Sequence, residues 1–311
     1  MREREQIHNL KTRVIRNRQM YLFLLLPLIY LIVFKYVPMV GAQIAFRDYN
    51  VKDGIWGSPW VGLYHFRKFL DSYQFKRVLT NTITLSLYSL IAGFPFPIIM
   101  ALALNSIRNK HYRSFIENVT YMPHFISTVV MVGIILQVFS PRIGVYSALY
   151  RLLFPGGTVP DILASATAFP HIYVWTGIWQ SLGWNSIIYM ASLSSVDIQV
   201  HEAAIIDGAS RFRRILHVDF PAIVPTIAIT LILQCGSLMN IGFDKVFLMQ
   251  NDLNLRASEV ISTYVYKVGI ASGGNNFSYG ASIGLFNSAV NFVLIIIVNT
   301  VSRHVSGSSL W

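Results

Sequence analysis

The chain has 311 residues, of which 54% are apolar and only 13% are charged. Charged residues make up about a quarter of an ordinary soluble domain. A soluble fold of this length could not bury so much apolar surface and still cover its outside with polar groups. The composition therefore excludes a water-soluble protein and predicts one embedded in lipid. The single cysteine, Cys235, excludes an internal disulfide framework and a zinc ribbon.

The net charge of +11 arises from 25 Lys and Arg residues against 14 Asp and Glu residues. Such an excess can indicate nucleic-acid binding, but no soluble segment carries a basic face interleaved with aromatic residues. In a membrane protein the same excess is expected in loops that face the anionic inner leaflet. The charge therefore favours membrane lipid as the partner, and no nucleic acid is expected.

The N-terminal part of the sequence predicts a basic cytoplasmic tail over residues 1–20 and then a first membrane span over Met20–Phe46. Lys35 interrupts this apolar stretch, which is tolerable if its amino group reaches the interface. A signal peptide is the rival interpretation, because a basic start, an apolar core and the small residues at Val40–Ala42 also fit one. The long, aromatic-rich core favours a retained helix.

Five further spans are predicted from long runs without Asp, Glu, Lys or Arg. Each run exceeds the roughly 20 residues that cross about 30 Å of hydrocarbon at about 1.5 Å per residue. The runs are Val78–Ile107, Asn118–Pro141, Ile162–Val196, Phe220–Phe243 and Val268–Ser302. We therefore expect an all-α membrane protein in which residues 21–311 form one domain of six transmembrane helices.

Basic residues near the ends of these spans predict how the chain is oriented. They gather in the tail, in the short segment 108–113, and after the fourth span at Arg211, Arg213 and Arg214. Cytoplasmic loops of membrane proteins carry the excess of Lys and Arg. Both termini are therefore expected in the cytoplasm, and the chain is expected to be a multi-pass protein of the cell membrane.

One polar stretch on the predicted inner side, residues 194–225, has the pattern of a docking element and is called the knob below. Ser195 or Asp197 can cap a short helix, and Gly208 can end it through a left-handed turn. Ser210 can cap a second short helix, which is expected to stop at Pro221. Its small, apolar and charged residues suit a groove on another protein. An ordinary interfacial loop with scattered charges would have a similar composition.

The same stretch resembles the EAA motif of permease subunits of ABC importers. In that motif Glu-Ala-Ala precedes a glycine and, further on, Ile-x-Leu-Pro. Here Glu202-Ala203-Ala204 is followed at the family's spacing by Gly208 and by Val218-x-Phe220-Pro221. Val and Phe replace the family's Ile and Leu, and both exchanges remain apolar. The stretch from Asp207 to Ala209 and the second proline, Pro225, are similar to the carbohydrate branch of these permeases.

The resemblance covers nearly the whole chain from Tyr21 onward. The segments Ile44–Asn50, Trp60–Phe66 and Asn81-Thr82 look like those of the LplB-like oligosaccharide permeases, a group that includes importers of alginate and pectin-derived oligosaccharides. It implies a type I ABC importer permease fold with a cytoplasmic coupling loop over residues 194–225. It also implies ATPase-coupling roles for Glu202, Ala203, Ala204, Asp207, Gly208, Arg211 and Pro221.

The partners implied by the resemblance are a second, homologous permease in a heterodimer, two ATPase subunits and an extracytoplasmic solute-binding protein. ATP and Mg would bind to the ATPase subunits. This chain has no G-x-x-x-x-G-K-[ST] stretch to cradle phosphates, so it is expected to be non-catalytic and to bind no cofactor or metal itself.

A sugar path should combine aromatic rings, which cover CH faces, with amides that bond hydroxyls. Intramembrane Asn and Gln also serve helix packing, and Trp near helix ends often anchors the interface, so these structural roles remain open for each residue. The candidates for the substrate path are Tyr173, Trp175, Trp179, Gln180, Asn185, Tyr189, Gln234, Asn240, Asp244 and Asn287.

Two other function classes fit the composition less well. A secondary transporter would carry a buried ionisable residue for ion coupling and usually inverted repeats, whereas the predicted spans are uncharged. An intramembrane enzyme is disfavoured because no H-E-x-x-H motif occurs. The G-x-S-x-G match at Gly280–Gly284 lies in a helical run, and no Asp or Glu follows Ser282.

Overall fold

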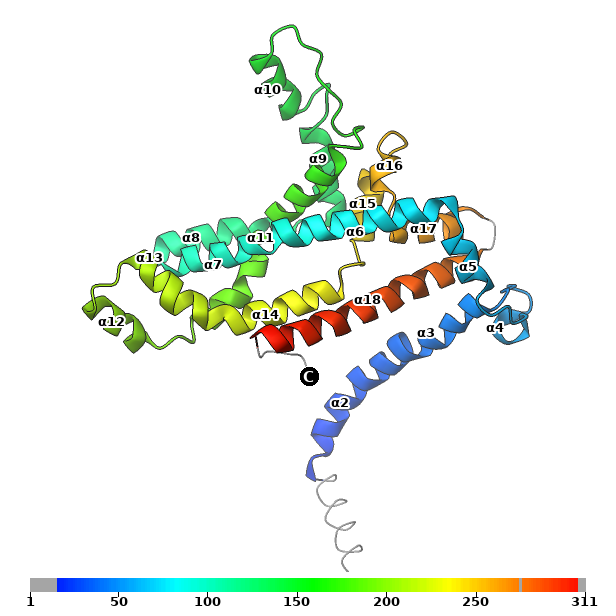
Figure 1. Cartoon of the computed structure of the whole chain (residues 1–311), viewed down its shortest axis with the longest axis horizontal. Helices are drawn as coiled ribbons and strands as arrows, with labels where there is room; N and C mark the ends of the chain where they lie inside the picture. The colour runs from blue at the N-terminus through cyan, green and yellow to red at the C-terminus, as the bar shows by residue number, and fades with distance from the viewer. Residues whose placement is uncertain (1–15, 274–275, 307–311) are drawn as a thin grey trace, which may run out of the picture.

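The structure of the protein is a computed structural model that describes residues 16–273 and 276–306 (Figure 1). Within these ranges every regular element is a helix, and the strand-like pairing is a single isolated bridge between Arg47 and Trp60. The all-α class is therefore confirmed for the described part of the chain. Residues 1–15 of the predicted basic tail lie outside it.

The first predicted span is a helix that diverges from the remaining helices (Figure 1, blue). α2 (Arg18–Leu31), the π turn η1 (Ile32–Tyr36), α3 (Val37–Val40) and the 3₁₀ turn η2 (Gly41–Phe46) form one helix of 29 residues. Its most apolar stretch is entirely unburied within the chain, and η2 makes its main contact with the C-terminal helix. This apolar surface is therefore available to lipid or to another subunit.

The second span follows two short helices, α4 (Gly54–Gly57) and α5 (Tyr64–Leu70). It consists of α6 (Tyr73–Gly93) and α7 (Pro95–Asn105), which together make 33 residues. Ser72 caps its start, because its hydroxyl accepts a hydrogen bond of 3.2 Å from the Phe75 N–H.

The third predicted span is bent, which differs from the single helix expected over Asn118–Pro141. α8 (Lys110–Tyr121) and the 3₁₀ turn η3 (Met122–Phe125) meet α9 (Thr128–Val138) at 99°. Pro123 cannot donate a backbone hydrogen bond, and Ser127 starts a new helix by capping the Val130 N–H. The free Ile126 carbonyl at the bend accepts a hydrogen bond of 3.0 Å from the Gln180 amide.

After α10 (Val145–Leu153), α11 (Phe169–Leu193) runs through the centre of the molecule and contacts α6, α7, α8 and α14. Its approach to α8 requires a glycine. A Cβ at Gly183 would lie 2.3 Å from the Thr120 carbonyl oxygen, so any side chain there would push the two helices apart.

The C-terminal part returns along this bundle. Its elements after the knob are α14 (Phe220–Gly236), α15 (Phe243–Met249), α16 (Leu255–Ser258), α17 (Ile261–Tyr266), the π turn η5 (Lys267–Ala271) and α18 (Phe277–Ser306). α18 packs on α14 and η2 and runs back toward the end of the bundle that carries the knob (Figure 1).

Four described helices are long and apolar enough to cross a membrane: Arg18–Phe46, Tyr73–Asn105, Arg211–Gly236 and Phe277–Arg303. The bent pair α8–α9 would add a fifth. α11 has 25 residues, but its tryptophans, amides and hydroxyls make it less apolar than these four. Four or five candidate spans are therefore present by length and composition, and six spans stay a prediction.

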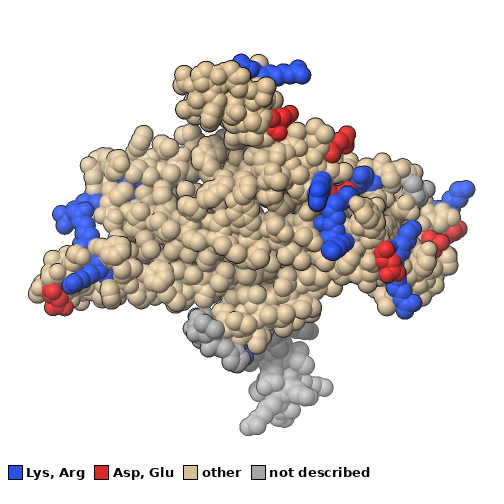
Figure 2. Space-filling model, turned by 45° about the horizontal axis from the view of Figure 1, so that its top comes forward, with Lys and Arg blue, Asp and Glu red and all other residues tan. Residues whose placement is uncertain are grey.

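Charge is distributed as a membrane protein requires. On the face shown in Figure 2, charged side chains gather at the two ends of the helical bundle and on the projecting α10 region, and the broad middle is nearly free of them. One buried carboxylate helps to hold together the end of the bundle opposite α12 and α13: Glu259 is 2% exposed and pairs with Arg77 and with Lys267, the latter at 3.7 Å.

Candidate functional site

The knob folds as two helical segments around a glycine turn, as the sequence predicts. Asp197 caps α12 (Ile198–Ile206) by accepting a hydrogen bond of 2.9 Å from the Gln199 N–H. Gly208 follows in the left-handed conformation with φ +74°. The N–H groups of Ala209 and Gly208 bond the carbonyls of Ala204 and Ile205, at 2.9 and 3.0 Å. This is the Schellman arrangement that ends a helix with glycine.

The second helix of the knob does not stop at Pro221, so that expectation is wrong. Ser210 caps α13 (Arg211–Arg214), the π turn η4 (Ile215–Asp219) continues it, and α14 follows without a break. The result is one helix over Arg211–Gly236. Pro221 has no N–H to donate to the preceding turn. The helix widens there into a π turn, in which the Phe220 N–H bonds the Ile215 carbonyl five residues earlier, and then continues.

The residues predicted to couple to an ATPase lie together on this knob, and Figure 1 shows α12 and α13 at one tip of the molecule. All of them except Ala204 are exposed. Beside them is a cavity of about 460 Å³ whose walls include Glu202, Arg211 and, from the segment after α7, Arg108. The basic segment 108–113 and the knob therefore lie on the same face.

Asp219 ties the knob to the bundle and is a residue that sequence reasoning missed. It is 4% exposed, and its Oδ1 atom lies 3.3 Å from His201 Nε2 of α12. The same oxygen accepts a hydrogen bond of 3.1 Å from the amide of Asn105, the last residue of α7. An acidic residue directly before the apolar Phe220-Pro221 step was the available signal.

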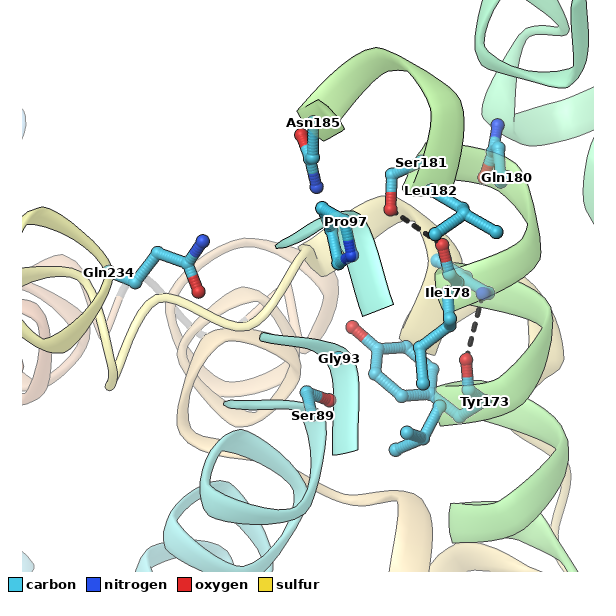
Figure 3. Close-up of a pocket in the computed structure, with 13 residues that line it drawn as sticks. Ser89, Gly93, Pro97, Tyr173, Ile178, Gln180, Ser181, Leu182, Asn185 and Gln234 are labelled. Atoms are coloured by element: carbon cyan, nitrogen blue, oxygen red, sulfur yellow. Dashed lines mark hydrogen bonds between the residues drawn. The ribbon is translucent and has the colours of Figure 1, made fainter. Parts of the chain in front are cut away.

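A second feature is a cavity of about 280 Å³ between the α6–α7 junction, α11, α14 and α15 (Figure 3). Its walls include the polar residues Ser89, Asn185 and Gln234 and the ring of Tyr173. Figure 3 shows these residues coming from different helices toward a shared space. An adjacent cavity of about 230 Å³ shares Tyr173 and Gln234 and adds Asn240. Amides, a hydroxyl and an aromatic ring are the groups that bind sugars.

Four residues of the predicted substrate path line the larger cavity: Tyr173, Gln180, Asn185 and Gln234. Gln180 has a structural partner, because its amide holds the Ile126 carbonyl at the bend of the third span. Asn240 lines the smaller cavity and accepts hydrogen bonds of 3.1 Å from both Asn287 and Asn291. Asn287 does not line either of these two cavities itself, but it contacts Asn240, which lines the smaller one.

The other predicted path residues lie elsewhere. Tyr189 is 2% exposed and its hydroxyl lies 2.9 Å from the Thr230 hydroxyl, between α11 and α14. Trp175 donates a hydrogen bond of 2.9 Å to the Tyr88 hydroxyl, and Trp179 is 52% exposed. Asp244 is exposed and lines neither cavity.

Lys245 is the charged residue of the larger cavity, and sequence reasoning missed it. It is 9% exposed, and its Nζ donates a hydrogen bond of 2.9 Å to the Tyr173 carbonyl. Burial lowers the pKa of its ammonium to about 8. Its position two residues past the predicted fifth span had the pattern of an ordinary interfacial charge. Among the described residues, no group of three or more His, Cys, Asp or Glu could hold a metal ion.

Comparison with known proteins identifies the family. Residues 93–307 match the model of the family described as "binding-protein-dependent transport system inner membrane component". The chain belongs to this family. It is 41% identical to protein LplB of Bacillus subtilis, over 93% of this chain and 89% of that one. It is 37% identical to the polygalacturonan/rhamnogalacturonan transport system permease protein YteP of the same organism, over 97% of this chain and 92% of that one.

A solved structure agrees with these relatives. The fold matches a chain in the crystal structure of a bacterial ABC transporter involved in the import of the acidic polysaccharide alginate, with a TM-score of 0.86 and 34% sequence identity. The match covers 96% of this chain and 99% of that one. The protein therefore has the ABC importer permease fold.

These findings confirm the main functional prediction. The protein is a multi-pass inner-membrane permease subunit of an ABC importer of sugars or oligosaccharides, and that importer depends on a binding protein. It is a non-catalytic transport component without a cofactor of its own. The secondary-transporter and intramembrane-enzyme alternatives do not apply.

Proposed function

We propose that this permease forms one half of an oligosaccharide pathway and receives the ATP-driven movement through the knob. The observation that carries the proposal is that two helices connect the knob to the cavity of about 280 Å³ that Tyr173, Asn185 and Gln234 line. The helix Arg211–Gly236 begins in the knob and brings Gln234 to the cavity, about 35 Å away along its axis. α7 bonds Asp219 through Asn105 and brings Pro97 to the same cavity.

The mechanism is a mechanical one. Closure of two ATPase subunits around ATP and Mg displaces the knob, and its displacement moves α7 and the helix Arg211–Gly236, both of which line the cavity. Nucleotide supplies the difference in free energy between the two states, which this chain cannot supply by itself. The residues given the coupling role are Glu202, Ala203, Ala204, Asp207, Gly208, Arg211 and Pro221.

The proposed assembly has a second, homologous permease as the other half of a heterodimer. The unburied apolar helix Arg18–Phe46 supports this arrangement, because a neighbouring permease or lipid must cover it. A solute-binding protein would deliver the oligosaccharide to the face opposite the knob.

The proposed topology has six spans with both termini in the cytoplasm. α11 and the bent pair α8–α9 are then spans in addition to the four most apolar helices. Arg108, Lys110, Arg113 and the knob share one face, and an excess of basic residues near helix ends favours the cytoplasmic side.

The cargo is proposed to be an oligosaccharide that passes Tyr173, Asn185, Gln234 and Asn240. The polar and aromatic lining supports it, as do the polygalacturonan/rhamnogalacturonan permease and the alginate transporter that this chain resembles. Trp175, Trp179, Gln180, Tyr189, Asp244 and Asn287 would support the pathway's shape.

Docking of the ATPase subunits tests this proposal. Glu202→Lys reverses an exposed charge on the knob, so it should lower the ATPase recovered with the affinity-purified permease several-fold and lower ATP-dependent uptake in parallel. Asp252→Lys, the same kind of change at an exposed outer-loop carboxylate, is the matched control and should leave recovery unchanged. Unchanged recovery with Glu202→Lys would argue that the knob is not the docking element.

A further inference from the structure

Lys245 has an environment that a buried cation does not normally tolerate. Its ammonium lies 4.9 Å from the centre of the Tyr173 ring and bonds the Tyr173 carbonyl at 2.9 Å. Both partners are neutral. No ion pair of Lys245 occurs among the described residues, and the adjacent carboxylate of Asp244 is exposed.

Burying an ammonium without a counter-charge is costly, and proteins normally pair or neutralise such a group. Here the group stands at the wall of a cavity of about 280 Å³, so an anion can reach it from that space. Gly177 leaves room for the amine: a Cβ at that position would lie 3.3 Å from Nζ. The geometry is that of a preformed site for one negative charge.

The other groups of the cavity restrict what that anion can be. Ser89, Asn185 and Gln234 offer donors and acceptors suited to hydroxyls, and the Tyr173 ring offers a face for C–H groups. A sugar ring that carries a carboxylate satisfies all of these groups at once. A free inorganic anion would bind the ammonium but would make no contact with the face of the Tyr173 ring and would not need the amides of Asn185 and Gln234.

We propose that Lys245 binds the carboxylate of a uronic-acid-containing oligosaccharide and thereby selects acidic over neutral cargo. This rests on the proposed oligosaccharide pathway and assigns a specificity-determining residue to it. The competing origin of the counter-charge is a carboxylate of the second permease, and the experiment below separates the two.

The test uses the assembled complex in proteoliposomes and in detergent. Equilibrium dialysis measures binding of radiolabelled trigalacturonate and of its carboxyl-reduced trigalactose counterpart to the nucleotide-free complex, and ATP-driven uptake of trigalacturonate from saturating binding protein is measured in parallel. Lys245→Met should weaken trigalacturonate binding about tenfold or more, the loss expected for one charge-assisted hydrogen bond. Trigalactose binding should change little.

Lys245→Arg keeps the charge and should retain most of the trigalacturonate binding. Lys52→Met makes the same substitution at an exposed lysine of the outer loop and should behave as the wild type. Equal binding of both saccharides by the wild type, or unchanged trigalacturonate binding by Lys245→Met, would overturn the inference and leave the proposed pathway standing.

Two further outcomes have separate meanings. Loss of the second permease from purified Lys245→Met would show that Lys245 serves an ion pair between subunits, which also overturns the inference. Failure of the wild type to import any tested oligosaccharide with ATP and binding protein present would instead reject the proposed pathway, and the inference with it.

Discussion

Gly208 is the residue whose backbone geometry the knob needs. It has φ +74°, and no atom lies within 4 Å of where its Cβ would be, so a substitution there strains the backbone without creating a clash. Gly208→Val should cost about 1–2 kcal/mol locally and disturb the turn between α12 and α13. We expect normal membrane insertion, continued ATP hydrolysis and strongly reduced uptake, measured in proteoliposomes of the complex.

A matched control exists in the same chain. Gly156 has φ +84° and equally open surroundings, but it lies between α10 and α11. Gly156→Val therefore imposes the same strain away from the knob and should leave uptake coupled to ATP hydrolysis. Normal transport by Gly208→Val would rule out the turn as the coupling element.

The protonation state of Lys245 predicts that uptake depends on pH. Its pKa is lowered to about 8 by burial, and it faces the Tyr173 ring and carbonyl with no carboxylate among the cavity residues. The ammonium is lost as the pH rises through that value. Raising the pH from about 7 to about 9 should therefore lower the protonated fraction, and uptake of a carboxylate-bearing substrate, about tenfold.

Lys245→Arg provides the comparison, because a guanidinium stays charged throughout this range. Its uptake rate should stay nearly flat from about pH 7 to about pH 9, with the same binding protein and the same substrate as the wild type. A parallel decline in the two proteins would assign the pH effect to another part of the complex.

Among the elements, Asp219 joins three of them: α12 through His201, α7 through Asn105, and the long helix to which it belongs. Asp219→Ala leaves the half-buried Asn105 amide without its acceptor, at a cost of about 1–3 kcal/mol. We expect a lower unfolding temperature of the purified complex and a larger uptake defect than ATPase defect.

Asp71→Ala is the control for this change, because Asp71 is an exposed aspartate between α5 and α6, far from the knob. It should alter neither quantity. Asp219→Asn preserves the shape of the side chain and should fall between the two. If Asp219→Ala left both the unfolding temperature and uptake unchanged, α7 would not depend on this contact.

The whole molecule has two ends, and the proposed topology places them on opposite sides of the membrane. In a Cys235→Ala background, Trp56→Cys introduces a thiol in α4 at a position that is 74% exposed, and Ile206→Cys introduces one on the knob at a position that is 86% exposed. A membrane-impermeant maleimide should label Trp56→Cys in intact cells and Ile206→Cys only after permeabilisation. The reverse pattern would invert the topology.

Much of this architecture could be predicted, because apolar runs and the knob pattern are local properties of the chain. The caps at Asp197 and Ser210 and the left-handed turn at Gly208 all form where the sequence indicates. The bend at Pro123 and the helix that continues past Pro221 did not follow the same local rules. At the bend the Gln180 amide from another helix holds the Ile126 carbonyl, and before Pro221 a π turn lets the helix continue, which no local pattern reveals.

The amino-acid sequence by itself determined that the chain is helical, lipid-embedded and equipped with an ABC permease knob, because hydropathy, turn residues and motif spacing act within short segments. Tertiary structure alone decided which of the polar residues share a cavity. Tyr189 became a packing residue, whereas Lys245 came to face Tyr173 and Gln234. The reason is geometric: residues from α6, α7, α11, α14 and α15 meet there, and their distances depend on how those helices cross.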